Sequence, residues 1–205
     1  MNALVKFGSR EHILQLQEEG LLYMNNLPYF WKIEDDGLRG DVFDSINGVD
    51  RGIKGKITFQ GGTELSDAVT NWTLRMPPKE PKKINIFCMY AFRPSEGAFP
   101  VDDKNFKFGD FSLVVTNPQE FISRIGTHLK NHRIKGKANF VEYVDNKYTG
   151  PVGPFKKLKK FDYQFEWRLV CCDGPGMACK ISIGNIHDIS IVIPSNKINE
   201  KIMSV

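Results

Sequence analysis

The chain has 205 residues, and its formal net charge of +4 is well short of the strongly basic balance of a protein that coats nucleic acid. A hydrophobic share of 41% and a charged share of 25% are typical of a folded protein and exclude a disordered chain. No stretch approaches the ~20 apolar residues of a membrane-spanning helix, and the opening MNALVKFGS is not a signal peptide. We therefore expect a single cytoplasmic domain over residues 1–205 with no membrane segment.

The first part of the chain predicts a strand over Leu4–Phe7, followed by a helix. Ser9 is a suitable N-cap for a helix over Arg10–Glu19, and Gly20 would end it. The next expected elements are a strand at Leu21–Met24, a short helix at Leu27–Asp36, a loop with a hairpin at Gly37–Gly55 and a strand at Ile57–Phe59. The segment Leu65–Leu74 fits either a helix or a strand.

The second part predicts mostly strands and one clear helix. Ile84–Phe92 is nearly all apolar, which is typical of a central strand buried on both faces. Asn117 followed by Pro118 marks the start of the helix. Further strands are expected at Phe111–Thr116, Phe140–Val144, Tyr163–Cys172, Cys179–Ile183 and Ile189–Ile193, with a turn at Pro175–Gly176 joining two of them as a hairpin and a short helix after Pro194. This order predicts one α+β domain with a largely antiparallel central sheet and two or three packed helices.

The cysteines and the short motifs exclude several kinds of site. The four cysteines show no CxxC or Cys/His spacing, so we expect reduced thiols and no metal. A P-loop, a GxGxxG after a strand, GxSxG and HExxH are all missing from the sequence. The acidic run Glu34–Asp36, followed by Asp41 and Asp44, contains hard-cation ligands. Because its spacing matches no calcium loop and Arg39 interrupts it, we interpret it as a solvated turn.

Two basic tracts lie beside aromatic residues, at Lys130–Lys137 and Lys156–Lys160. Cationic side chains next to rings on which bases stack are what a single-stranded nucleic acid or a nucleotide requires. Within the second tract the candidate binding residues are Lys156, Lys157, Lys159 and Lys160. The alternative is a solvated surface that balances acidic segments elsewhere.

The segment FDYQFEWRLV carries the candidate catalytic residues. In a strand it would place Gln164, Glu166 and Arg168 on one face and the apolar Phe165, Trp167 and Leu169 on the other. Two interpretations of Glu166 remain open. It is a site residue, or it pairs with Arg168 or a lysine within the sheet.

Several segments together resemble an uncharacterised bacterial and phage domain family. The opening VKFGSREHILQLQEEGLLYMNNLPYF with RGDVFD after it is similar to that family's first strand, helix, second strand and Asp-rich turn. The late FDYQFEWRLV is similar to its aromatic-Gln-x-Glu-x-Arg strand. The family has no settled biochemical function, and the resemblance implies a setting in prophages or in defence against phage.

A second resemblance is to ADP-ribosyltransferases, which have an early strand–helix unit and a late Gln-x-Glu or Glu-x-Glu strand. By this resemblance Glu166 would be catalytic, stabilising the ribosyl cation formed as nicotinamide leaves NAD, with Gln164 as its helper. Lys6 or Arg10 would stand where the family holds the NAD phosphates, and Arg168 would also contact substrate.

Three functional hypotheses follow, and each requires a different feature of the fold. An ADP-ribosyltransferase-like enzyme acting on NAD or a related nucleotide needs a concave pocket that contains Glu166. A non-catalytic protein of phage–host conflict that binds nucleotide or single-stranded nucleic acid needs a contiguous positive surface. A structural or interaction protein needs an apolar patch or a dimer face. The sequence leaves the oligomeric state open.

Overall fold

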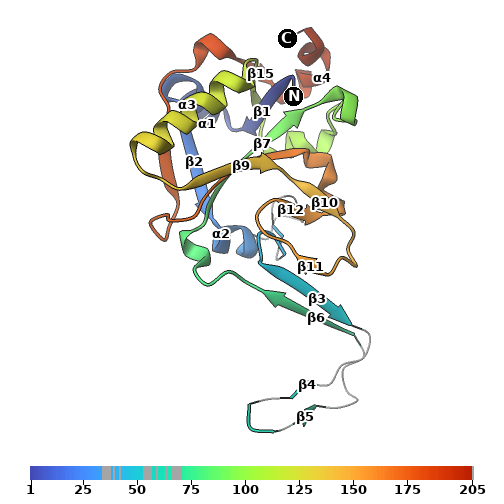
Figure 1. The fold of residues 1–205 in the computed structure, drawn as a ribbon. Coiled ribbons are helices and arrows are strands. Elements are labelled where there is room, and N and C mark those ends of the chain that lie inside the picture. The colour runs from blue at the N-terminus through green and yellow to red at the C-terminus, as the bar shows by residue number, and fades with distance from the viewer. Residues whose placement is uncertain are drawn as a thin grey trace.

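An antiparallel sheet forms the centre of the fold (Figure 1). Its eight strands are β1 (Ala3–Gly8), β2 (Leu21–Asn26), β7 (Asn85–Phe92), β8 (Phe111–Val115), β9 (Gly136–Phe140), β13 (Glu166–Cys171), β14 (Cys179–Ser182) and β15 (Ser190–Pro194). They run in the order β14-β2-β7-β1-β8-β15, with β13 paired to β7 and β9 paired to β13. This computed structural model describes residues 1–33, 38, 40–41, 43–52, 57–58, 60–62, 64–65 and 71–204. The sheet and its helices confirm the predicted α+β class.

The two longest helices cover one face of the sheet. The helices are α1 (Arg10–Glu19), α2 (Leu27–Lys32), α3 (Pro118–Asn131) and α4 (Ile198–Lys201). Ile13 of α1 and Phe121 of α3 pack in one core cluster with Trp167 of β13, whereas Ile198 of α4 packs on the opposite face. The predicted caps are confirmed, because the Ser9 and Asn117 side chains accept hydrogen bonds from the first turns of α1 and α3.

The central strand β7 is buried on both faces, as its apolar run predicts. Phe87 and Tyr90, which point to opposite faces, are 3% and 4% exposed. On one side β7 pairs with β13 along its length. On its other side β1 pairs only with Tyr90–Phe92, and β2 pairs only with Asn85–Ile86. Because β1 and β2 diverge, residues 87–89 have no neighbouring strand on this side in the described part of the chain.

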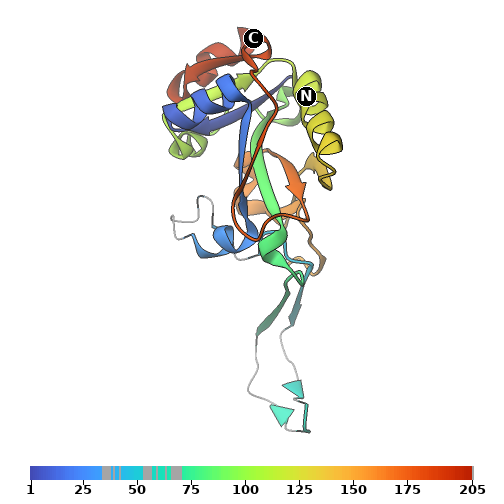
Figure 2. The same cartoon turned by 90° about the vertical axis from the view of Figure 1, so that its left-hand side faces the viewer.

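A two-stranded arm projects from the body of the molecule (Figures 1 and 2). Its strands are β3 (Gly48–Gly52) and β6 (Trp72–Met76), with β11 (Gly150–Pro151) paired to β3 at the base. The short strands β4 (Ile57–Thr58) and β5 (Glu64–Leu65) pair with each other farther along the arm, and β10 (Glu142–Val144) and β12 (Lys156–Leu158) form a parallel pair near its base.

Three sequence predictions about the second half of the chain are wrong. The expected strand Phe140–Val144 is divided, because β9 ends at Phe140 beside β13 and β10 begins at Glu142 beside β12. The expected strand Tyr163–Cys172 begins only at Glu166, because Lys159–Gln164 forms 3-10 turns and Phe165 adopts a left-handed conformation with φ 39°. Phe165 therefore does not lie on the Trp167 face, but packs near Tyr90 on the opposite one. The expected hairpin at Pro175–Gly176 does not form either, because β14 pairs with β2 and not with β13.

Other predictions fall partly outside the described residues. Helix α2 ends at Lys32, where a helix to Asp36 was expected. The acidic run Glu34–Asp36, with Arg39 after it, lies outside the described residues, as do Phe59 and residues 66–70.

Candidate functional site

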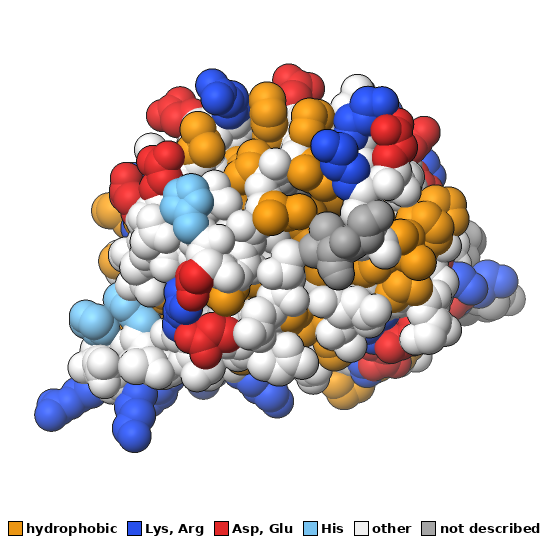
Figure 3. Space-filling model, turned by 90° about the horizontal axis from the view of Figure 1, so that it is seen from above, with side chains coloured by type: hydrophobic (Ala, Val, Ile, Leu, Met, Phe, Trp, Pro, Cys, Tyr) orange, Lys and Arg blue, Asp and Glu red, His pale blue; other side chains and the backbone are white. Residues whose placement is uncertain are grey.

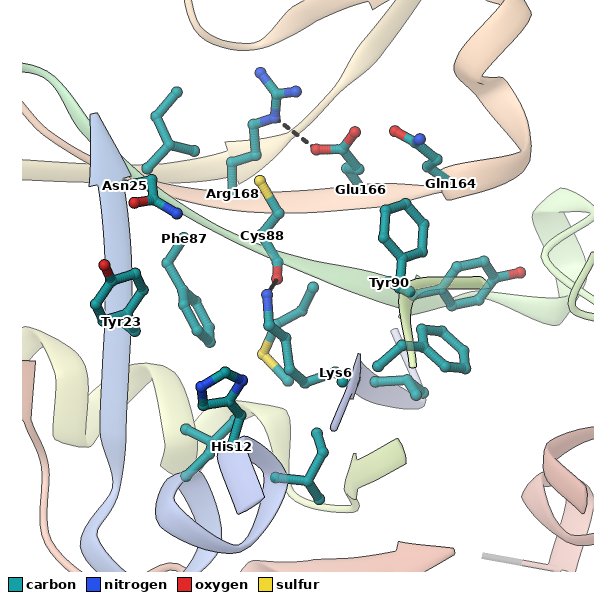
Figure 4. A pocket seen from close by; sticks show the side chains of 18 of the residues that line it. Lys6, His12, Tyr23, Asn25, Phe87, Cys88, Tyr90, Gln164, Glu166 and Arg168 are labelled. Carbon is teal, nitrogen blue, oxygen red and sulfur yellow. Dashed lines mark hydrogen bonds and ion pairs between the residues drawn. The ribbon is translucent and has the colours of Figure 1, made fainter. Parts of the chain in front are cut away.

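A cavity of about 540 Å³ lies where β1 and β2 diverge from β7 (Figure 4). Helix α1 connects these two strands, so its first turn also reaches the cavity. The side chains labelled in the close-up that line the cavity are Lys6, His12, Tyr23, Asn25, Phe87, Cys88, Tyr90, Gln164, Glu166 and Arg168. A volume of this size is typical of a small-molecule site.

Lys6 crosses the gap between β1 and β7. Its Nζ donates to the carbonyl oxygen of Cys88 at 2.8 Å and lies 4.6 Å from the centre of the Phe87 ring. Even-numbered residues along β7 direct their backbone groups toward β1 and β2. The Phe92 carbonyl accepts from the N–H of Asn2, just before β1, and the Ile84 carbonyl accepts from the N–H of Leu27, just after β2. Lys6 therefore supplies a partner for a carbonyl that the diverging strands leave without one.

One wall of the cavity is a cluster of buried charges. Arg168 is 1% exposed, and it donates to both oxygens of Asp44 at 2.6 and 2.8 Å and to Glu166 Oε2 at 2.7 Å. Lys157 donates to Glu166 Oε1 at 2.8 Å and to Gln164 at 2.7 Å. Each carboxylate oxygen of Glu166 thus has a cationic partner. The four charges sum to zero, as buried charges require.

The neighbouring cations keep Glu166 ionised. Burial alone would raise the pKa of Glu166, but the charges of Arg168 and Lys157 outweigh burial and hold this pKa well below its usual value. Burial would likewise lower the pKa of Lys157, but Glu166 and Asp44 raise it. A carboxylate held in this way is a weak base, and two cations neutralise its charge.

The cysteine in the cavity wall is not an activated nucleophile. Burial, with a smaller contribution from the Glu166 charge, raises the pKa of the Cys88 thiol to about 12. Because the thiolate is the reactive form, Cys88 is inert near neutral pH.

The remaining walls offer rings and further nitrogen-bearing side chains. Tyr23 is 49% exposed and lies with Phe87 and His12 around the same opening, into which Lys6 also points (Figure 4). Lys180 of β14 also lines this part of the cavity. The site therefore combines surfaces on which a flat ring can stack with groups that attract an anion.

The structure brings together five of the candidate residues that the sequence indicates. Gln164, Glu166, Arg168, Lys6 and Lys157 all line the cavity. Glu166 pairs with both Arg168 and a lysine, as the second interpretation of this residue predicts.

The other candidates do not line the cavity. These are Arg10, Lys156, Lys159 and Lys160. Arg10 is exposed and lies over Phe111. The basic run is not one binding face, because Lys157 is 5% exposed within the charge cluster, while Lys156 donates to the Tyr148 hydroxyl.

Sequence reasoning also missed two acidic residues. Asp41 and Asp44, expected in a solvated turn, are each 3% exposed. The burial of Asp44 depends on Arg168, a partner 124 positions away along the chain, whereas Asp41 accepts a hydrogen bond from the Phe43 N–H. Burial and the charge of Asp44 raise the pKa of Asp41. In the sequence, the signal for a buried acidic residue is Arg168 within its strand, because a buried arginine needs an acidic partner.

The upper surface of the molecule carries charges of both signs. Figure 3 shows acidic and basic side chains distributed among hydrophobic ones on this face, without a contiguous positive field. Across the described residues, no group of three His, Cys, Asp or Glu side chains could hold a metal ion. None of the helices that the structure describes is long and apolar enough to cross a membrane.

Comparisons of the chain with protein families, with curated proteins and with solved structures find no match.

Proposed function

We propose that this protein binds a nucleotide, with NAD as the first candidate, in the cavity between β1 and β2. The observation that carries the proposal is the convergence of Lys6, Lys180 and His12 on a cavity that Tyr23 and Phe87 line. A nucleotide has a flat base for the rings and phosphates for the cations. The cavity volume suits a ligand of this kind.

The first turn of α1 supports a phosphate at this end of the cavity. Gly8 and Ser9, which precede the helix, line the cavity together with His12. The free N–H groups and the dipole of a helix N-terminus favour an anion. Lys6 lies on the strand that leads into this turn, so both attractions act in the same region.

The proposal favours binding without catalysis. In a transferase of the resembled type, a glutamate stabilises positive charge that develops on the ribose. Glu166 lines the cavity, but Arg168 and Lys157 neutralise its carboxylate. A single-stranded nucleic acid is a weaker candidate ligand, because Lys157 is withdrawn from the basic run. The resemblance of the sequence adds phage–host conflict in the cytoplasm as the proposed setting.

Calorimetric titration of NAD, ADP-ribose and ATP into the protein tests the proposal. We expect binding that weakens with added salt, because charge pairing with phosphate is screened. Lys6→Met keeps the side chain's length, removes its charge and should weaken binding. The matched control is Lys201→Met, which removes one exposed charge from α4, a helix with no residue in the cavity lining. Absence of binding for all three ligands, or equal binding by both variants, would contradict the proposal.

A transferase remains the second candidate, because Glu166 and Gln164 both line the cavity. It predicts release of nicotinamide when NAD is incubated with the wild-type protein. Glu166→Asp keeps the negative charge beside Arg168 and Lys157 but withdraws the carboxylate. If the enzyme hypothesis holds, this variant should bind NAD and lose nicotinamide release. Binding of NAD by the wild type without release would leave the binding protein as the function.

A further inference from the structure

Strand β6, on the outside of the projecting arm, has one edge with no partner strand among the described residues. The arm sheet has the order β11-β3-β6, so β6 pairs with β3 on one side only. The N–H and C=O groups of a free edge are a template for pairing with another strand. Proteins usually protect such edges with lysine, with proline or by keeping the strand short.

The free edges of the central sheet carry this protection. β9 exposes Lys137, β14 exposes Lys180 and β15 ends in Pro194. β6 reads WTLRM and contains neither lysine nor proline. Its one charged residue, Arg75, turns toward the ring of Phe43, 5.5 Å from the guanidinium carbon. β6 is thus the least protected of these edges.

One face of β6 is an apolar stripe. Trp72, Leu74 and Met76 alternate along the strand and therefore share a face. Leu74 is 54% exposed and Met76 is 38% exposed. On the neighbouring strand, Gly52 lies opposite Trp72 and Gly48 lies opposite Met76.

These two glycines keep the stripe flat. A Cβ atom at Gly52 would lie 2.5 Å from the Trp72 ring, and one at Gly48 would lie 2.8 Å from Met76 Cε. The large side chains therefore lie across the backbone of β3. On this face the exposed Asp50 lies opposite Leu74, and beyond it the apolar side chains of β6 extend to the free edge of the arm.

We propose that β6 pairs antiparallel with β6 of a second copy of this chain, centred on Leu74. In this register Leu74 faces the partner's Leu74, and Trp72 faces the partner's Met76. Directly opposed residues share a face, so the two stripes join into one apolar surface. Thr73 faces the partner's Arg75, so no like charges are directly opposed.

The pairing is self-complementary and closed by a two-fold axis, which is the commonest symmetry of soluble dimers. It extends the described arm strands into one continuous antiparallel sheet. It uses residues remote from the cavity, since no residue of β3 or β6 lines it. The dimer therefore does not depend on the proposed ligand.

Sedimentation velocity over a series of protein concentrations tests for the dimer. The wild type should sediment as a dimer, with an apparent mass twice that of the 23.4 kDa chain. Leu74→Lys places two like charges opposite each other at the centre of the interface and should abolish the dimer. The control is Met203→Lys, which introduces the same charge at an exposed apolar residue outside the arm and should leave the dimer intact. A wild type that stays monomeric, or a Leu74→Lys variant that stays dimeric, would overturn the proposal.

A cross-link tests the register. In a Cys172→Ser background, which removes the exposed native thiol, Leu74→Cys should form an intermolecular disulfide on mild oxidation. Directly opposed Cβ atoms of an antiparallel pair are about 4.5–5.5 Å apart, close enough for small shifts to bring the sulfurs into bonding range. Asp50→Cys, one strand farther from the edge, should give none. A dimer that forms without the Leu74→Cys cross-link would assemble through another face and would refute the pairing.

Discussion

At the scale of single residues, the strongest feature is the pair of cations that engages Glu166. Buried ion pairs repay the cost of desolvation only when each charge has well-placed partners. Arg168 supplies one by a hydrogen bond of 2.7 Å, and Lys157 supplies the other at 2.8 Å. Removal of one charge leaves the others uncompensated. The resulting loss in the free energy of unfolding should therefore exceed the loss caused by breaking any exposed ion pair that the structure describes.

Glu166→Gln should therefore destabilise the fold by about 3–5 kcal/mol. The matched control is Glu142→Gln, because the Glu142 side chain is 67% exposed and lies 3.7 Å from Lys156. An exposed pair contributes only about 0–1 kcal/mol. Urea denaturation of both variants measures the difference. Equal midpoints for the two variants would mean that the buried cluster contributes no more than a surface pair.

The sequence predicted part of this cluster. The expected position of Glu166 within a strand indicated a pairing partner. In the structure Glu166 is the first residue of β13, and both Arg168 and a lysine act as partners. Asp44 could not be predicted, because it lies in a segment rich in glycine and aspartate, which indicates an exposed turn. Its burial is a property of the tertiary fold. The function of Glu166 as a catalytic residue stays a prediction.

At the scale of elements, local signals located the helices well and the strand pairings poorly. The caps at Ser9 and Asn117 mark the starts of α1 and α3. The turn residues after β13 suggested a hairpin, but a turn sequence does not encode which strand lies beside which. Gly174 here donates its N–H to the Lys83 carbonyl, which directs the chain across β7 toward β2.

Glycine substitutions test this chain path. A Cβ atom at Gly174 would lie 1.8 Å from Oδ1 of Asn85, a fully buried residue whose amide nitrogen donates to the Met24 and Met177 carbonyls. Gly174→Ala should cost about 1–3 kcal/mol through overpacking. Gly126→Ala, within α3 where nothing lies near the added atom, should stabilise the protein by about 0.4–1 kcal/mol. Thermal melts compare the two, and a neutral Gly174→Ala would contradict the close approach.

At the scale of the whole molecule, the composition and the order of elements predicted the α+β class and the antiparallel sheet. The cavity was beyond such prediction, because it arises where two strands diverge, and no local pattern in β1 or β2 marks that point. The arm was missed for a different reason. Its strands carry glycine at Gly48 and Gly52, and glycine in a short segment predicts turns.

Global stability should fall as the pH falls, in two windows. Burial and the nearby His132 lower the pKa of His128 from its ordinary 6.5, so its contribution is complete above that pH and is lost below it. Glu166 has a folded-state pKa far below its ordinary 4.5, so its contribution is complete above 4.5 and is lost on further acidification. Denaturant midpoints from about pH 7 to about pH 3 measure both losses. The loss of stability below pH 4.5 should be smaller in Glu166→Gln than in the wild type. The raised pKa of Asp41 acts in the opposite direction, because protonation relieves its buried charge. The decisive comparison is therefore with Glu166→Gln, and an equal loss of stability below pH 4.5 in both proteins would contradict the Glu166 shift.

The divergence of β1 and β2 also has a consequence for the rate at which backbone protons exchange with water. Cys88 lies in the middle of a strand that is buried on both faces, yet its N–H points into the gap, away from the β13 ladder. Its neighbours Phe87 and Met89 are directed toward β13 and are protected by that ladder. Cys88 should therefore exchange faster than either neighbour, in a strand whose other amides open only on global unfolding. A ligand seated against the gap would slow that one amide, which makes it a reporter of occupancy.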